Sequence, residues 1–170
     1  EGATRTADRF VVADANTNGG NIIDGGAVDN LATTNSVANA DVLEVRDEAV
    51  VTAGDLQNVK NVGTIAFNND TSVLHTLNLQ LNDTVVDAMV DSYHAATTAE
   101  VEVLKIDMND AAVTEVAGAA LVLDITQLTA KSGVAVTLAA GAGAAADTIA
   151  LGVNNNTAVA ITGFTAGIDK

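Results

Sequence analysis

The sequence predicts a mainly β fold, a β-solenoid or a layered β-sandwich, with one or two short helices. Apolar and polar residues alternate over short segments, which is typical of half-buried strands. Clusters of Asn, Asp and Gly, which favour turns, separate these segments. The 170 residues include no cysteine, no proline and only four aromatic side chains. The core therefore has to be built from Val, Ile, Leu and Ala.

Residues 1–40 are rich in Asn, Thr, Asp, Gly and Ala, with short apolar bursts at 10–12 and 22–23. The clusters Asn18-Gly19-Gly20 and Asp24-Gly25-Gly26 are turn signals, so we expect short strands joined by turns; a flexible arm is the alternative. Because this segment has too few large apolar residues for a core of its own, we separate it from a β-rich core domain at 41–170. It is a candidate for contact between subunits, unless it folds back on its own chain.

The remaining strands follow from period-two alternation. We expect them at 42–45, 64–67, 77–81, 101–108, 121–125, 134–138, 147–151 and 158–162. Segments 79–86 and 106–113 align at an offset of 27 residues, and a repeat of this length suggests layers of strands in which each unit adds one rung.

Two segments favour helix. Apolar residues at helical spacing between 86 and 93 predict a helix that begins at Thr84, with Asp83 or Thr84 as its N-cap. A shorter helical piece is expected from Asp55 to Val59.

The charge balance excludes several partners. Seven Lys and Arg residues against 22 Asp and Glu residues give a net charge of −15. Such a surface repels phosphate backbones and anionic lipid headgroups, so we expect no nucleic-acid partner. The longest weakly polar stretch, 134–146, is far shorter than the roughly 20 residues of a membrane-spanning helix, so we expect no membrane insertion.

Calcium is the cofactor that the sequence favours, since carboxylate and amide oxygens are its usual ligands. The run from Asp14 to Gly19 has the pattern Asp-x-Asn-x-Asn-Gly, the first half of a calcium-binding loop. We predict a site of modest affinity formed by Asp14, Asn16, Asn18 and Asp24. The twelfth position, where such a loop carries a bidentate Glu, is a glycine, and an Asn/Gly turn without an ion is the alternative.

No catalytic set stands out, and we expect no enzyme. His75 and His94 lack metal-ligand spacing, and the pair Ser72 and His75 lacks a third group. The acidic residues near Arg46, which are Glu44, Asp47 and Glu48, are interpreted as solvated surface charge, as are Glu100 and Glu102. A glycosidase pair would need sugar-stacking aromatic residues, which the chain hardly has.

Segments at the start, in the middle and at the end of the chain follow a recognisable order. The start contains Phe10-Val11-Val12-Ala13-Asp14, Ile22-Ile23-Asp24-Gly25-Gly26-Ala27 and Asp41-Val42-Leu43-Glu44-Val45, and the middle contains Asp55-Leu56-Gln57-Asn58-Val59-Lys60-Asn61-Val62. The end contains Gly141-Ala142-Gly143, Asp147-Thr148-Ile149 and Ile161-Thr162-Gly163-Phe164-Thr165-Ala166-Gly167-Ile168-Asp169-Lys170. In this order they resemble the β-strand-repeat regions of bacterial S-layer and RTX-type proteins exported by type I secretion. The strict Gly-Gly-x-Gly-x-Asp repeats of a calcium β-roll are missing.

The resemblance implies a secreted structural protein, extracellular or on the cell surface, that assembles with copies of itself into a surface layer or a filament. Its many small residues let chains pack closely and let sheet edges pair. Cell-surface polysaccharide is a further candidate partner. The alternative function is a calcium-dependent adhesin or a ligand-binding β-solenoid module.

Overall fold

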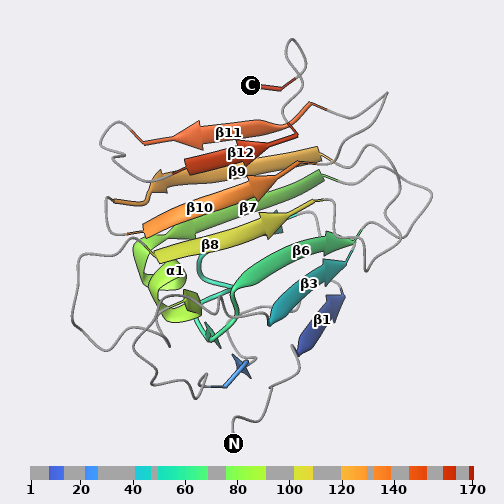
Figure 1. The fold of residues 1–170 in the computed structure, drawn as a ribbon, viewed down its shortest axis with the longest axis vertical. Coiled ribbons are helices and arrows are strands. Elements are labelled where there is room, and N and C mark those ends of the chain that lie inside the picture. Colours follow the sequence, from blue (N-terminus) through green and yellow to red (C-terminus); the bar gives the residue numbers. More distant parts are fainter. Residues whose placement is uncertain are drawn as a thin grey trace, which may run out of the picture.

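The computed structural model describes residues 8–13, 22–26, 41–46, 50–68, 76–90, 102–108, 120–129, 132–138, 146–152, 159–163 and 169–170. Within these ranges the protein is mainly β and contains one short helix (Figure 1). The elements in chain order are β1 (Arg9–Ala13), β2 (Ile23–Asp24), β3 (Val42–Arg46), β4 (Val50–Val51), β5 (Val59–Lys60), β6 (Thr64–Asn68), β7 (Thr76–Asn82), α1 (Asp83–Val90), β8 (Glu102–Asp107), β9 (Ala120–Gln127), β10 (Ser132–Thr137), β11 (Thr148–Leu151) and β12 (Val159–Thr162).

The largest sheet has six strands in the order β1-β3-β6-β8-β10-β12, and all neighbouring strands are parallel. Its register aligns apolar residues in one row that crosses every strand: Phe10, Leu43, Ile65, Ile106, Val136 and Ile161. Successive side chains of a strand point to opposite faces, so this row lies on one face, the inner face.

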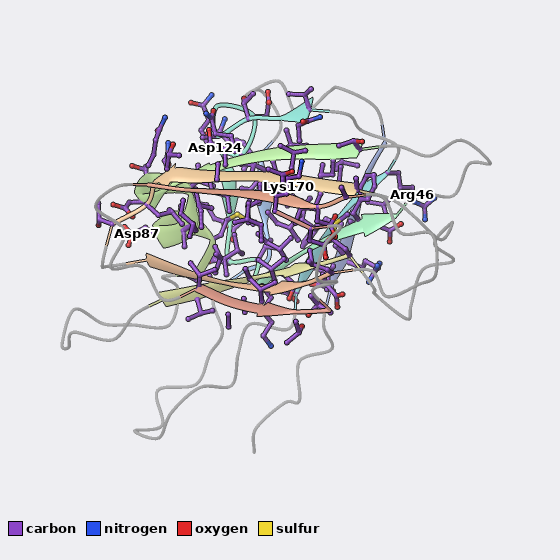
Figure 2. All side chains as sticks on the ribbon, turned by 90° about the horizontal axis from the view of Figure 1, so that it is seen from above. Arg46, Asp87, Asp124 and Lys170 are labelled. Atoms are coloured by element: carbon purple, nitrogen blue, oxygen red, sulfur yellow. The ribbon has the colours of Figure 1, made fainter. Side chains whose placement is uncertain are left out.

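A second parallel sheet has four strands in the order β11-β9-β7-β4, and a small third sheet pairs β2 with β5. Figure 2 shows the two larger sheets as two layers with side chains filling the space between them. From β6 to β12 the chain alternates between these layers. Parallel neighbours cannot be joined by a tight hairpin, so each connection has to cross over, and here a strand of the opposite sheet lies on the return path.

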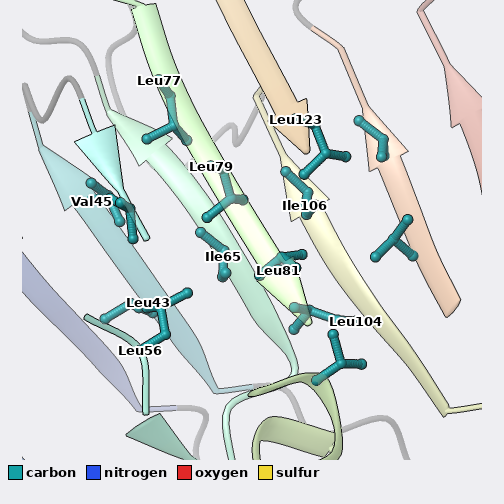
Figure 3. Close-up of a cluster of buried hydrophobic side chains, with 14 of the residues drawn as sticks. Leu43, Val45, Leu56, Ile65, Leu77, Leu79, Leu81, Leu104, Ile106 and Leu123 are labelled. Carbon is teal, nitrogen blue, oxygen red and sulfur yellow. The ribbon is translucent and has the colours of Figure 1, made fainter. Parts of the chain in front are cut away.

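The core between the sheets is aliphatic, as the composition requires. In β7, Leu77, Leu79 and Leu81 are buried, while Asn78 and Gln80 between them are partly exposed, which is the alternation that predicted this strand. Leu residues of β7 and β9 meet Ile and Leu residues of β6 and β8 across the gap (Figure 3). Phe67 is the one aromatic side chain among the fully buried residues that the structure describes.

The mainly β prediction is confirmed, and strands lie at or within two residues of every segment where we expected one. Helix α1 is confirmed as well, but Asn82 caps it: the Asn82 Oδ1 atom accepts a hydrogen bond of 2.9 Å from the Val85 backbone N–H. The Asp83 carboxylate instead accepts a hydrogen bond of 2.9 Å from the Thr129 backbone N–H, and so ties the helix to the end of β9.

The prediction of a second helix from Asp55 to Val59 is wrong. Residues 53–58 form consecutive turns, and Val59 begins strand β5. The Asp55 carboxylate accepts hydrogen bonds of 2.8 Å and 2.6 Å from the Thr52 backbone N–H and hydroxyl group. Reciprocal bonds of this kind can start a helical turn. The chain leaves the helical path at Val59, because Val59 pairs with Ile23 of β2.

The prediction that the 27-residue repeat forms successive rungs of one sheet is also wrong. Its two halves begin in β7 and β8, which belong to different sheets. Strands that do pair are offset irregularly; for example, Val42 pairs with Thr64 but Thr64 pairs with Lys105. Period-two alternation makes any two strand-and-turn segments alike, whichever sheet they join.

The boundary at residue 40 does not separate the sheets. β1 pairs with β3 and β2 pairs with β5, so described parts of 1–40 share sheets with the segment 41–170. Whether this segment also contacts a neighbouring subunit stays a prediction.

Candidate functional site

Three of the four predicted calcium ligands, Asp14, Asn16 and Asn18, lie outside the described residues. The fourth, Asp24, ends β2, and its Oδ1 atom accepts hydrogen bonds from the Gly26 backbone N–H at 2.8 Å and from the Asn61 side-chain amide. No group of three or more His, Asp or Glu side chains that could hold a metal is found among the residues that the structure describes. The calcium site stays a prediction.

The two histidines and Ser72 also lie outside the described ranges, so the structure adds nothing to their assignment. No helix in the described part of the chain is long and apolar enough to span a membrane.

The interpretation of Glu44 as solvated surface charge is wrong. Glu44 is 1% exposed, although it points to the outer face of the six-stranded sheet, opposite to its buried neighbours Leu43 and Val45. Its carboxylate forms ion pairs with the Nε atoms of Arg9, on β1, and Arg46, the latter at 2.6 Å. A buried carboxylate needs such partners to offset the loss of hydration. Glu44 therefore ties the edge strand β1 to β3.

A groove of about 430 Å³ lies beside these ion pairs on the outer face. Its polar lining comes from Arg9, Thr64, Lys105, Asp107 and Thr137, on four strands of the sheet. The chain has seven Lys and Arg residues, and this face gathers Arg9, Arg46 and Lys105. Glu44 and Asp107 on the same face offset two of these three positive charges, and Lys105 is the exposed cation of the groove.

Buried aspartates at strand starts hold neighbouring strands together. Asp41 precedes β3, and its carboxylate accepts a hydrogen bond of 2.7 Å from the Asp8 backbone N–H, just before β1. Asp147 precedes β11, and its carboxylate accepts one of 2.6 Å from the Leu121 backbone N–H in β9. We did not predict this role, although an aspartate directly before an apolar strand was visible in both segments.

Burial raises the pKa of Asp147; the hydrogen bond from Leu121 opposes this shift, and the nearby Asp169 carboxylate adds to it. The chain's last residue lies alongside: the Lys170 N–H donates to the Asp147 carbonyl, and the Ile149 N–H donates to the Lys170 carbonyl, both at 2.9 Å. Lys170 thus covers the beginning of the β11 edge.

The end of the two sheets formed by β11 and β12, here named the C-terminal end, is open. In the inner row of the six-stranded sheet, Ile106 and Val136 are each 1% exposed, but Ile161 on β12 is 38% exposed. In the other sheet, Leu151 on β11 is 58% exposed, whereas its register partner Ile125 on β9 is fully buried. β11 and β12 are edge strands, and Figure 1 shows both at the top of the stack. Among the residues that the structure describes, no further strand covers these core-facing side chains.

Sequence reasoning missed both the buried Glu44 and the open end. Glu44 had no local signal, because alternation with Leu43 and Val45 places it on the outer face and its partner Arg9 is 35 residues away in the sequence. The exposure of Leu151 and Ile161 also had no signal, because a strand's sequence does not say whether it lies inside a sheet or at its edge.

Comparison of the chain with family models, curated proteins and solved structures finds no match.

Proposed function

We propose that this protein is an extracellular structural protein that assembles with copies of itself into a surface layer or a filament, and that its fold is a β-solenoid. The path of the chain supports the solenoid: from β6 to β12 its strands enter two parallel sheets alternately, so each passage through both sheets adds a layer to the stack. A stack of this kind has two ends, and each end exposes unpaired backbone groups.

The open C-terminal end is the observation that carries the proposal. A folded protein that acts alone gains by covering core-facing side chains, and edge strands are commonly protected by charges, bulges or a covering segment. β11 and β12 contain no charged residue, and their inward-facing Leu151 and Ile161 are exposed. An uncharged edge with exposed apolar side chains favours the addition of another strand.

The net negative charge of the chain is the reason that calcium is part of this proposal. Two copies with a net charge of −15 repel each other, and the repulsion falls when divalent cations bind. We therefore expect calcium, through the site of Asp14, Asn16, Asn18 and Asp24, to promote assembly.

Negative-stain microscopy and light scattering of the purified protein test the function. Regular fibres or lattices that form in calcium, and not in chelator with matched ionic strength, are the expected result. Magnesium at the same concentration is the control for charge screening. Monodisperse particles under every condition and at every concentration would contradict the proposal.

The groove on the outer face favours a second candidate, a ligand-binding module for an acidic cell-surface polysaccharide. Lys105 is exposed, and no hydrogen bond or ion pair of its side chain with another described residue is found. Calorimetry with polygalacturonate as the probe tests this function. Binding that Lys105→Met weakens and Lys60→Met leaves unchanged would support it; binding that is absent, or equal in both variants, would argue against it.

A further inference from the structure

We infer that copies of this chain join head to tail, with strand β12 of one copy pairing in parallel with strand β1 of the next. The inference rests on the proposed function and assigns its contact: it makes the assembly one-dimensional and names the strands at the joint.

Strand direction is the first argument. All neighbouring strands of the six-stranded sheet are parallel, with β1 at one edge and β12 at the other. A second copy moved along the stack, without reversal, presents a β1 edge that is parallel to β12. The contact joins two different surfaces and does not close on itself, so it repeats and gives a filament.

The register supplies the second argument. Along the inner face, the row of paired residues runs from Phe10 on β1 to Ile161 on β12. If this row continues into the next copy, Ile161 lies beside the next copy's Phe10, which packs against the core from an edge strand. On the outer face the corresponding row runs from Val11 to Thr162. A shift by one residue would put core-facing side chains on the outer face, so the allowed registers differ by two residues.

Electrostatics favour this pair of edges. β12 carries no charge, and β1 carries Arg9 but no acidic residue. Two acidic copies therefore meet where neither strand adds negative charge. The ion pair between Arg9 and Glu44 also holds β1 in place before a partner arrives, which lowers the entropy lost on pairing.

The size of the contact sets the conditions of the test. Four paired residues span about 13 Å, and the two sheets lie about 10 Å apart. The strip between the sheets is thus about 130 Å² on each copy, or roughly 260 Å² on both. This is well below the roughly 1,200 Å² of a standard stable interface. Lys170 also covers part of the β11 edge, so pairing is concentrated on β12. We expect assembly only at high protein concentration.

Disulfide cross-linking is the most direct test, because the chain has no cysteine of its own. The double variant Val11→Cys, Thr162→Cys should give a ladder of covalent oligomers after mild oxidation under assembly conditions. If the register is shifted by two residues, the pair Val11→Cys, Ala160→Cys should give the ladder instead. Within one chain the two sites are five strand spacings apart, about 24 Å, whereas a disulfide needs Cα atoms within about 7 Å. A ladder therefore reports contact between copies.

Matched variants separate this joint from others. Val103→Cys, Thr162→Cys places the first cysteine at an exposed valine of the interior strand β8 and should give no ladder. A covalent dimer of Thr162→Cys alone would show that two C-terminal ends meet, and would overturn the inference. So would the absence of a ladder from both double variants in preparations that form filaments.

A charge at the joint gives an independent readout. Ile161→Lys should raise the protein concentration needed for assembly by about tenfold or more, with an unchanged circular dichroism spectrum, while Val103→Lys should assemble like the unaltered protein. Normal assembly of Ile161→Lys would overturn the inference and leave the proposed function standing. If the unaltered protein forms no assembly at all, the proposed function fails and the inference fails with it.

Discussion

The two ends of the sheet stack are built from similar strands but differ in how far their core-facing side chains are covered. At the N-terminal end, formed by β1, β4 and the β2–β5 pair, the turn and strand at 52–62 bury Leu56, Val59 and Val62, and Glu44 fastens β1 with two arginines. At the C-terminal end, Leu151 and Ile161 point inward and remain exposed. At the N-terminal end the chain covers its core positions while β1 remains the edge strand of the six-stranded sheet, whereas the C-terminal end leaves its last core positions exposed.

The difference teaches that an inward-facing position on an edge strand joins the core only if another segment covers it: Val51 on the edge strand β4 is 1% exposed, whereas Leu151 on the edge strand β11 is 58% exposed. Ile125 and Leu151 are paired in register, yet one is fully buried and the other is more than half exposed. Leu151 and Ile161 are therefore core-facing positions where binding of another chain would bury further apolar surface.

The largest expected effect comes from this pair of residues. Ile125→Ala removes fully buried methyl and methylene groups and should lower the free energy of unfolding by about 2–5 kcal/mol. Leu151→Ala should cost less than about 1 kcal/mol, because its side chain is largely hydrated already. Urea denaturation in dilute solution measures both, and similar losses would show that the C-terminal end is covered in solution.

This contrast marks where prediction from sequence ends. Alternation correctly located the strands, since it reflects which side of each strand is apolar. It could not assign them to sheets: the segments 79–86 and 106–113 look alike and belong to different layers. Sheet membership depends on where the chain returns, which local pattern does not contain.

Calcium should strengthen the N-terminal side. If Asp14, Asn16, Asn18 and Asp24 form one site, free calcium at about 100 times its Kd adds roughly 2.7 kcal/mol to the free energy of unfolding. Differential scanning calorimetry in calcium and in chelator measures this gain. Asp14→Ala should abolish it, and Asp87→Ala, an exposed position on α1, should not. Equal thermal unfolding midpoints in calcium and in chelator would contradict the predicted calcium site.

Gly25 offers a smaller change at the same end. A Cβ atom there would collide with the Asn61 carbonyl oxygen and would lie 2.6 Å from the Asp41 carboxylate that holds β1. Gly25→Ala should therefore cost about 1–3 kcal/mol. Gly54→Ala is the matched control, because the nearest atom to its Cβ would be 3.5 Å away. A Gly25→Ala protein as stable as the control would show that this end tolerates movement.

The smallest effect is a pH dependence at the C-terminal end. The pKa of Asp147 is raised by burial, so above its ordinary value of 3.8 the folded protein holds a proton that the unfolded chain has lost. The stability from this group is full below pH 3.8 and is lost as the pH rises through the raised pKa. Asp147→Asn should flatten this fall in urea titrations at several pH values, and an unchanged profile would contradict the assignment.

Asp124 has the opposite sign and serves as the comparison. Hydrogen bonds from the backbone and hydroxyl group of Thr126 lower its pKa. The stability that it contributes is present above pH 3.8 and is lost as the pH falls through the lowered value. Asp124→Asn should therefore reduce the loss of stability that occurs as the pH falls below 3.8. Asp147→Asn should not reduce this loss, because the pKa of Asp147 is shifted in the opposite direction.

The candidate sites were predicted less well than the fold. The calcium motif came from spacing alone, and three of its residues lie outside the described ranges. The burial of Glu44 depends on Arg9, which is 35 residues away in the sequence and adjacent only once β1 and β3 pair. Charge runs look solvated until pairing of distant strands brings their partners together.

Hydrogen exchange followed by mass spectrometry tests the central claim, that the C-terminal end is open and is covered on assembly. In dilute solution the amides of β12 should exchange much faster than those of β8, which lies inside the same sheet. On assembly, β12 and β1 should become protected while β8 stays unchanged. Equal protection of β12 and β8 in dilute protein, or no gain of protection at β12 in the assembled state, would contradict the account.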